Sequence, residues 1–571
     1  APRPLVPRQY RLEVLERMDA QGKVISSLNK RDVEKAVNYF LKNNISNIAI
    51  CFLNSYLNPK HEIEAKKIIK KINNSIKVSL SSNLIREFRE YERTSTTCIN
   101  AYIQETIINY IDKFIIGFKQ RGYKKSFFIN QSAGGLLSAK TAKLKPVSSL
   151  MSGPSGGVVA TSVFGKIENL SNLIAFDMGG TSTDVCVILE NKPKLTADSV
   201  LEGYPVMVPT LDVHSIGAGG GSIAHIDSVG SLIVGPKSAG AKPGPACYGM
   251  GGKNPTVTDA NCVLGRVAPS EFMPSGLNLN NNFALKAITN KVATPLKINH
   301  IQAAAGIIEI CNLKMSTAVR SITIERGLDP SDFTLCAYGG AGPMHACWIA
   351  KQLGIPCVLI PIAPGQFSAL GILLSQIRHD LVRTVSSNLP YKKIESIFLQ
   401  MQIEAKKLIK EEGVKVKKLS FDYSVDARYK GQEFTINVSL KNPKFTKINI
   451  KYFLNNFHQN YEKTYSHSAL NEKVEIINLR LIAIGHLKTI KIPKIARGTL
   501  KPLNIAKIAT TSVYFDNKSI DCDIWQRDKL LAGNQIKGPA MIVDFGSTTL
   551  IPNNCLCKVS DHGQLIINIK D

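Results

Sequence analysis

The chain has 571 residues, of which 44% are hydrophobic and 20% are charged, and a formal net charge of +27 at pH 7. This length suits about three or four domains with large cores, and the lack of any run of about eighteen apolar residues disfavours a membrane protein. The positive charge is spread over lysine-rich segments without interleaved aromatic residues, which disfavours nucleic-acid binding.

The N-terminal part of the chain alternates helical and strand patterns. Amphipathic periods predict helices over 31–43, 60–73 and 93–118, and apolar runs predict strands over 45–53 and 78–82, with a further strand from 127 that ends in a glycine turn at 134–135. This alternation indicates an α/β fold. Because the chain starts with Ala1-Pro-Arg-Pro and shows no signal-peptide pattern, we expect it to be the middle of a longer protein.

A phosphate loop is predicted between residues 177 and 184. The apolar runs on either side, 172–176 and 185–189, suit two buried strands, so the loop would lie at the tip of a β-hairpin. Glycines allow backbone N–H groups to approach an anion closely, and hydroxyl side chains add donors. The residues in question are Gly179, Gly180, Thr181, Ser182 and Thr183.

Two aspartates flank this loop. Asp177 and Asp184 can hold a hydrated Mg²⁺ against the phosphates, since this ion keeps several waters and needs only one or two carboxylates. A Walker-type loop is excluded because no Gly-Lys-Ser/Thr opens a helix here. The alternative interpretation is an ordinary hairpin turn, in which Gly, Asp and Thr are common.

A third acidic position precedes the glycine-rich segment 217–221. Asp212 and His214 are two residues apart, so on a strand their side chains share a face and can share a metal ion or a substrate proton. The glycines would let the backbone approach whatever they face, and His225 is interpreted as structural. Two side chains make only half of a metal site, so a second divalent metal at Asp212 and His214 is kept as a hypothesis.

A strand, a glycine cluster and a helix are predicted in succession over 335–353. The cluster comprises Gly339, Gly340, Ala341 and Gly342. Pro343 suits the first turn of the helix that follows, whereas His345 occupies the third glycine position of a dinucleotide fingerprint and weakens a Rossmann site. The loop then either contacts a phosphate or nucleoside beside the helix N-terminus or is a tight turn.

From about residue 385 the pattern changes to a helix up to 412 and alternating runs such as 434–440, with another helix over 448–461. This pattern predicts a β-rich C-terminal domain. The twelve cysteines show no Cys-x-x-Cys spacing and lie mostly in apolar runs. We therefore expect free buried thiols in a reducing, cytoplasmic compartment, and no zinc ribbon.

Eight motifs follow one another along nearly the whole chain. They are Glu90-Tyr-Glu-Arg-Thr-Ser-Thr-Thr97, Met151-Ser-Gly-Pro-Ser-Gly-Gly157, Phe176-Asp-Met-Gly-Gly-Thr-Ser-Thr-Asp184, Asp212-Val-His-Ser-Ile-Gly-Ala-Gly-Gly-Gly221, Gly244-Pro-Ala-Cys-Tyr-Gly249, Thr256-Val-Thr-Asp-Ala-Asn261, Glu325-Arg-Gly-Leu-Asp-Pro330 and Gly339-Gly-Ala-Gly-Pro343. Their order resembles the ATP-hydrolysing hydantoinase A/5-oxoprolinase family, of the N-methylhydantoinase A type. Eight ordered motifs are far more specific than any one of them.

The resemblance implies an actin-like, sugar-kinase-like ATPase fold with two α/β lobes. Residues 1–147 would form the remainder of the N-terminal lobe, 148–385 the second lobe, and 386–571 a C-terminal β-rich (α+β) domain. The hairpin at 177–184 would be the second phosphate loop and Gly339–Pro343 the adenosine loop. Family members also start with another Asp-x-Gly-Gly-Thr-x-Thr-Asp loop, upstream of the segment that resembles the start of this chain. We therefore expect either a truncated or split gene product or a relic that cannot hydrolyse ATP alone.

The chemistry that the resemblance implies is the opening of an amide. Transfer of the γ-phosphoryl group of ATP to the amide oxygen gives a phosphorylated imidate that water can attack. The protein then has to align the reactants and to neutralise the charge of the phosphates through loop N–H groups and Mg²⁺. Asp177 and Asp184 would position the Mg²⁺ and the water. Asp212, His214 and Asp259 are candidates for substrate or general-base contacts.

Two arginines are candidates for neutralising phosphate charge. Arg93 and Arg326 each have a neighbouring glutamate, Glu92 and Glu325, so local ion pairs are the equally good alternative.

Three functions follow from the resemblance. The first is an ATP-dependent cyclic amidase that acts on 5-oxoproline or a hydantoin as the A-type subunit beside a B-type subunit, within an oligomer. The second is a subunit of an ATP-dependent carboxylase for ketones such as acetone or acetophenone. The third is a non-catalytic actin-like nucleotide-binding module.

Overall fold

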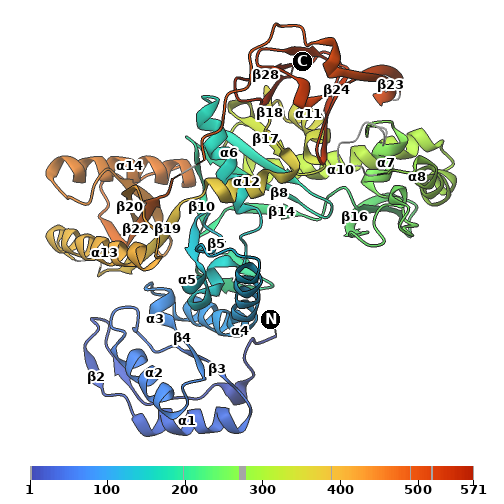
Figure 1. The fold of residues 1–571 in the computed structure, drawn as a ribbon. Coiled ribbons are helices and arrows are strands. Elements are labelled where there is room, and N and C mark those ends of the chain that lie inside the picture. Colours follow the sequence, from blue (N-terminus) through green and yellow to red (C-terminus); the bar gives the residue numbers. More distant parts are fainter. Residues whose placement is uncertain are drawn as a thin grey trace. The chain divides into compact units, whose positions relative to one another are not determined.

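The computed structural model describes residues 3–196, 199–268, 278–386, 389–488, 490–515 and 518–569 (Figure 1). The chain divides into two compact units, each built from separate segments. The first comprises Ala1–Ser152, Leu195–Thr210 and Ser375–Lys488, and the second comprises Gly153–Lys194, Leu211–Leu374 and Thr489–Asp571. The boundaries expected after residues 147 and 385 stay a prediction.

The first unit begins with a small α/β layer. Strands β3 (Asn47–Ile50) and β4 (Lys77–Leu80) pair in parallel, and helices α1 (Lys30–Lys42) and α2 (Lys60–Ile72) pack on each other. The Asn29 side chain caps α1 by accepting from two backbone N–H groups. The other elements of this part are β1 (Arg17–Met18), β2 (Val24–Ser26), α3 (Ser81–Leu84), α4 (Glu90–Gln120), β5 (Phe128–Asn130), β6 (Leu136–Ser138), α5 (Ala139–Leu144), β11 (Ser199–Leu201) and β12 (Tyr204–Val206). The α/β alternation that the sequence predicts is confirmed.

A six-stranded sheet forms the remainder of the first unit, in the order β21-β20-β22-β19-β6-β5. From Leu479 onward, β22 alternates buried and half-buried side chains, as expected for a sheet with one face on a core. Two helices share that core through buried Phe398, Phe453 and Phe457. The elements are β19 (Ile377–Thr384), α13 (Tyr391–Glu411), β20 (Lys418–Tyr429), β21 (Ile436–Leu440), α14 (Lys447–Tyr465) and β22 (Val474–His486).

The second unit is organised around a nine-stranded mixed sheet, in which β14-β8-β7-β17-β18-β29-β28-β25 are neighbours and β9 pairs with β8. Strands β7 (Leu173–Met178), β17 (Thr334–Tyr338) and β18 (Cys357–Ile360) run parallel, so their carboxyl ends meet at one edge. They are almost entirely apolar because both faces of the sheet are covered. The other strands are β8 (Thr183–Leu189), β9 (Lys192–Pro193), β14 (Val213–Ile216), β25 (Gln535–Lys537), β28 (Leu556–Val559) and β29 (Leu565–Asn568).

Helices and a smaller sheet complete the second unit. The smaller sheet has the order β23-β24-β26-β27, and α11 packs on β27. The elements are α6 (Ser155–Ile167), β15 (Ser222–Ile226), β16 (Leu232–Ser238), α7 (Val257–Val263), α8 (Asn281–Ile288), α9 (Thr294–Leu296), α10 (His300–Ile322), α11 (Gly342–Leu353), α12 (Phe367–Leu374), β23 (Lys507–Phe515), β24 (Lys518–Gln526), β26 (Ala540–Asp544) and β27 (Ser547–Ile551). In the described parts of the chain, no helix is both long and apolar enough to cross a membrane.

All twelve cysteines lie in the described ranges, and each is a free thiol. Burial raises the pKa of several of them, for example that of Cys336 to about 12. The prediction of free thiols is therefore confirmed.

Candidate functional site

The predicted phosphate loop is the tip of a β-hairpin in the second unit. Strands β7 and β8 pair antiparallel with Asp177 opposite Asp184, and the N–H of Gly179 donates to the carbonyl of Ser182 at 3.1 Å to close the turn. A Cβ atom added at Gly179 or Gly180 would meet no other atom within 4 Å. The hairpin prediction is confirmed, and the outer side of the loop is open.

The two carboxylates at this tip face each other. Directly paired residues of an antiparallel ladder project from the same face of the sheet, so the side chains of Asp177 and Asp184 are neighbours. Burial, together with the charge of Asp184, raises the pKa of Asp177 to about 6, although a hydrogen bond from Ser368 opposes the shift. Burial also raises the pKa of Asp184, against a hydrogen bond from Ser215.

This pair fits a divalent cation. Two half-buried carboxylates that repel each other lose that repulsion when a cation lies between them. Two carboxylates beside an open loop also match Mg²⁺, which keeps most of its waters. Asp177 and Asp184 are therefore the residues that would hold the metal.

The glycine-rich segment 217–221 packs against the back of the phosphate loop. The N–H groups of Gly220 and Gly221 donate to the carbonyls of Gly179 and Gly180 at 3.0 and 2.6 Å. A Cβ at Gly219 would lie 2.7 Å from the backbone of Thr181, so only glycine allows this approach. The glycines of this segment therefore lie against the phosphate loop.

The three loop hydroxyls have different surroundings. Thr183 is buried, and its Oγ1 donates to the carbonyl of Ala218 at 2.6 Å, so this hydroxyl holds the loop in place. Thr181 is exposed, and its Oγ1 lies 3.4 Å from Oγ of Ser238. Ser182 is half-buried. Thr181 and Ser182 are thus the hydroxyls of this loop that solvent or a ligand can reach.

The second predicted glycine loop lies beside the first. Strand β17 pairs in parallel with β7, with Tyr338 beside Asp177, and the N–H of Ala341 donates to the carbonyl of Met178 at 3.1 Å. Gly339 has a φ of +81°, and a Cβ there would lie 2.5 Å from Oδ1 of Asp177. Both the backbone conformation and the space require glycine. The loop at 339–342 thus contacts the carboxylate site directly.

A third segment, 363–368, was not foreseen from the sequence. It follows β18, and the carbonyl of Pro364 accepts from the N–H of Gly339 at 2.9 Å. Oγ of Ser368 donates to Oδ2 of Asp177 at 3.3 Å. Ala363 has a φ of +46°, an uncommon conformation for a residue with a side chain. The available signal was Ala363-Pro-Gly365 directly after a buried strand that ends at the same sheet edge.

The motif at 151–157 explains how Ser368 is held. A Cβ at Gly156 would lie 2.2 Å from the carbonyl oxygen of Ser368, and one at Gly371 would lie 1.7 Å from the carbonyl oxygen of Gly156. Helices α6 and α12 therefore cross with their backbones in contact. This crossing fixes the start of α12 next to Asp177.

Asp212 and His214 do not join the carboxylate pair. In the pairing of β14 with β8, Ser215 lies opposite Asp184 and His214 lies opposite Val185. Neighbouring residues of a strand project from opposite faces, so His214 lies on the face opposite to the carboxylate of Asp184. Asp212 forms an ion pair with Arg326, whereas the sequence left open either phosphate contact or an ion pair with Glu325 for this arginine. The described residues contain no group of three or more His, Cys, Asp or Glu side chains that could hold a metal. Asp212 is already neutralised by Arg326 and Lys194, which weighs against a metal there, and the second metal at Asp212 and His214 stays a prediction.

Asp259 is fully buried and has a structural environment. Its carboxylate accepts from the backbone N–H and hydroxyl of Thr256 at 2.9 and 2.7 Å, which forms a capping box at the start of α7. It also accepts from the N–H groups of Ala246 and Cys247 at 3.1 and 2.7 Å. These contacts join the motifs at 244–249 and 256–261. They give Asp259 the role of a positioning residue of the fold.

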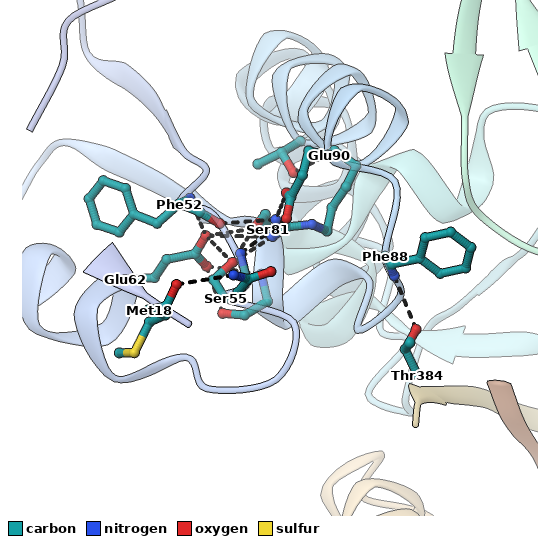
Figure 2. A network of polar contacts seen from close by, with 12 residues as sticks. Met18, Phe52, Ser55, Glu62, Ser81, Phe88, Glu90 and Thr384 are labelled. Atoms are coloured by element: carbon teal, nitrogen blue, oxygen red, sulfur yellow. Dashed lines mark hydrogen bonds and ion pairs between the residues drawn. The ribbon is translucent and has the colours of Figure 1, made fainter. Parts of the chain in front are cut away.

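Arg93 lies in the first unit. It belongs to the polar network around Ser55, Glu62, Ser81 and Glu90, and Figure 2 shows these four partners. The fully buried guanidinium donates to Glu90, to the carbonyl of Phe52 at 2.9 Å and to Oγ of Ser55 at 2.5 Å. The sequence left open phosphate contact or an ion pair with Glu92 for Arg93, and the structure pairs it with Glu90. Glu62, also fully buried, accepts from Phe52, Ser55, Ser81 and Ser82. Through these bonds and one to Ser81, Arg93 connects the loop after β3 with helices α3 and α4.

Three family descriptions match consecutive parts of the chain. The hydantoinase/oxoprolinase description covers residues 93–381, its N-terminal region covers 1–73, and its C-terminal domain covers 386–568. The chain belongs to the hydantoinase/oxoprolinase family.

Relatives in this family carry different activities in their names. The chain is 33% identical to the caprolactamase subunit alpha of Pseudomonas jessenii, over 96% of the chain and 80% of that protein. It is 30% identical to the acetophenone carboxylase gamma subunit of Aromatoleum aromaticum, over 100% of the chain and 80% of that protein. It is 29% identical to 5-oxoprolinase 1 of Arabidopsis thaliana, over 96% of the chain but only 44% of that protein.

One solved structure supports the same relationship. The ATP-dependent caprolactamase of Pseudomonas jessenii matches with a TM-score of 0.89 and 31% identity, over 100% of this chain and 83% of that one. The α/β architecture predicted from the sequence therefore agrees with that of an ATP-dependent amidase.

Proposed function

We propose that this chain is the A-type subunit of an enzyme that uses ATP to hydrolyse a cyclic amide of the 5-oxoproline or hydantoin type. The observation that carries the proposal is the meeting of three loops at the carboxyl ends of β7, β17 and β18, around Asp177 and Asp184. This sheet edge is where open α/β sheets bind ligands. The caprolactamase relative, whose name denotes a lactam, supports the choice of a cyclic amide.

The proposed reaction transfers the γ-phosphoryl group of ATP to the amide oxygen, and water then attacks the activated carbon. Gly180, Thr181 and Ser182 would bind phosphate oxygens through N–H and hydroxyl groups. Asp177 and Asp184 would hold Mg²⁺, which supplies positive charge against the phosphates. Gly339 and Gly340 would let the backbone approach the nucleotide.

Ser368 has a positioning role in this proposal. Its hydroxyl donates to Asp177 and leaves the other oxygen of that carboxylate beside Gly339. Ser215 donates in the same way to Asp184. Both hydroxyls stabilise ionised carboxylates, which is the form that binds a cation.

The proposal includes an actin-like fold and a B-type partner. The strand arrangement of the second unit, with phosphate and glycine loops at one sheet edge, supports an actin-like lobe. Several relatives are named as subunits of larger enzymes, among them caprolactamase alpha and acetone carboxylase beta, which supports a second subunit.

A second candidate is an ATP-dependent ketone carboxylase subunit, favoured by the 30% identity to the acetophenone carboxylase gamma subunit. Phosphorylation of a carbonyl oxygen is common to both reactions, so the phosphate site does not distinguish them.

The deciding experiment measures phosphate release by the chain, with and without its B-type partner. Cyclic amides such as 5-oxoproline, hydantoin and caprolactam are compared with acetone or acetophenone plus bicarbonate. Stimulation by a cyclic amide is expected. Bicarbonate-dependent turnover of a ketone, without stimulation by any cyclic amide, would refute the amidase proposal in favour of the carboxylase.

A further inference from the structure

An exposed phenylalanine lies at the tip of the β26–β27 hairpin. Asp544 pairs with Ser547, so Phe545 and Gly546 form the two-residue turn. Gly546 has a φ of +77°, a conformation that favours glycine, whereas Phe545 is 58% exposed and belongs to no common class of turn residue. A single exposed apolar residue is ordinary on a protein surface, so its position has to supply the argument.

The turn is packed against two of the loops at the candidate site. The carbonyl oxygen of Gly546 lies 3.5 Å from the position of a Cβ at Gly340 and 3.0 Å from that of a Cβ at Gly365. The carbonyl oxygen of Phe545 lies 3.6 Å from the same position at Gly365. The backbone of the β26–β27 turn therefore packs against the backbones of the loops that follow β17 and β18. This contact holds Phe545 next to those two loops.

Successive glycines link this turn to the carboxylates. Gly339 lies against Asp177, and Gly340, the next residue, lies against Gly546. Gly339 thus contacts the carboxylate pair at the phosphate loop, and Gly340, the next residue, contacts the turn that carries Phe545. A nucleotide has the same succession of chemistry, with charged phosphates at one end and a flat aromatic base at the other.

We propose that Phe545 is the stacking surface for the nucleoside base of the bound nucleotide. The inference rests on the proposed function, because it takes the phosphates to lie at Asp177 and Asp184. Base–aromatic stacking is strong enough to matter for affinity and tolerates any base, since every base has a π-face. Phe545 then determines preference for a nucleotide over a bare polyphosphate.

The test compares two probes on the full chain in the presence of Mg²⁺, namely ATP and inorganic tripolyphosphate, by calorimetric titration. Phe545→Ala is expected to weaken ATP binding about 5- to 100-fold, the range that one stacked base supplies. Binding of tripolyphosphate should be unchanged. Phe545→Tyr keeps the ring and should restore ATP binding. Phe434→Ala, which removes a ring that is 69% exposed in the first unit, is the matched control and should change neither affinity.

The outcomes separate this inference from the proposed function. Equal affinities of the wild-type chain for ATP and tripolyphosphate would overturn the stacking role and leave the phosphate site standing. The same holds if Phe545→Ala weakens both probes equally or neither. A wild-type chain that binds neither probe would overturn both proposals.

Discussion

Two clusters of charged residues in this chain have opposite surroundings. In the first unit, Glu62 and Arg93 are fully buried, and protein donors and acceptors surround both charges. In the second unit, Asp177 and Asp184 face each other beside an open loop, and each has a raised pKa. The first arrangement stabilises the protein as it stands. The second is stabilised only when a cation or a proton is added, which is the property of a binding site.

The largest effect is expected when the open pair is broken. Asp177→Asn keeps the shape of the side chain but removes the charge that would hold the metal. Turnover of ATP should fall by about 10²- to 10³-fold, comparable to the loss of a principal electrostatic contact in other active sites. Phosphate release measures this, and Asp332→Asn, at an exposed aspartate of the same unit, serves as the control. Full activity of Asp177→Asn would remove this residue from the site.

Breaking the buried network of Arg93 and Glu62 should lower the stability of the protein. Arg93→Met leaves Glu62 without its cationic neighbour, and breaking a buried pair in this way costs about 3–5 kcal/mol. Urea unfolding should be followed by circular dichroism, because Trp348 and Trp525 both lie in the second unit. Lys113→Ala, at an exposed position of the same helix α4, is the control. A loss below about 1 kcal/mol would show that the network is not structural.

The pH dependence of stability distinguishes the two regions further. Because the folded pKa of Asp177 is about 6, raised from 3.8, the folded state holds the proton more tightly than the unfolded state. This group therefore lowers the free energy of unfolding as pH rises from about 4 to about 6, by an amount on the order of 3 kcal/mol. Asp177→Asn should melt higher than the wild type at pH 7.5, and the difference should vanish near pH 4. A variant that melts lower at pH 7.5 would contradict the raised pKa.

A substitution in the glycine-rich segment 217–221, which packs against the phosphate loop, should have a smaller effect on activity. Gly219→Ala places a methyl group 2.7 Å from the backbone of Thr181, which costs about 1–3 kcal/mol of stability and displaces the loop. ATP affinity should fall as well. Gly153→Ala, where an added Cβ meets nothing within 4 Å, is the control. Equal behaviour of the two variants would mean that the segment 217–221 does not position the loop.

The smallest effect is expected at the ion pair of Asp212. Both partners are partly exposed, and such pairs contribute about 0–1 kcal/mol. Asp212→Asn should therefore melt within a few degrees of the wild type and keep its ATPase activity. A large loss of activity would return Asp212 to the list of catalytic candidates.

The sequence predicted those features that depend on local pattern. Apolar runs around Gly179 and Gly180 gave the hairpin, and the strand before Gly339 gave its neighbour. The pairing of Ser368 with Asp177 depends on the crossing of α6 and α12, which brings together residues 191 positions apart. The sequence also indicated that His214 and Asp212 share a face of one strand. It could not predict the register of β14 on β8, and this register puts His214 on the face opposite to Asp184.

The central claim is that Asp177 and Asp184 form a metal-dependent phosphate site. Calorimetric titration of ATP into the wild-type chain and into the double variant Asp177→Asn/Asp184→Asn, with Mg²⁺ and with a chelator, tests it most directly. We predict that Mg²⁺ strengthens ATP binding to the wild type and has no effect on the double variant. The same Mg²⁺-dependent gain in both proteins would contradict the account.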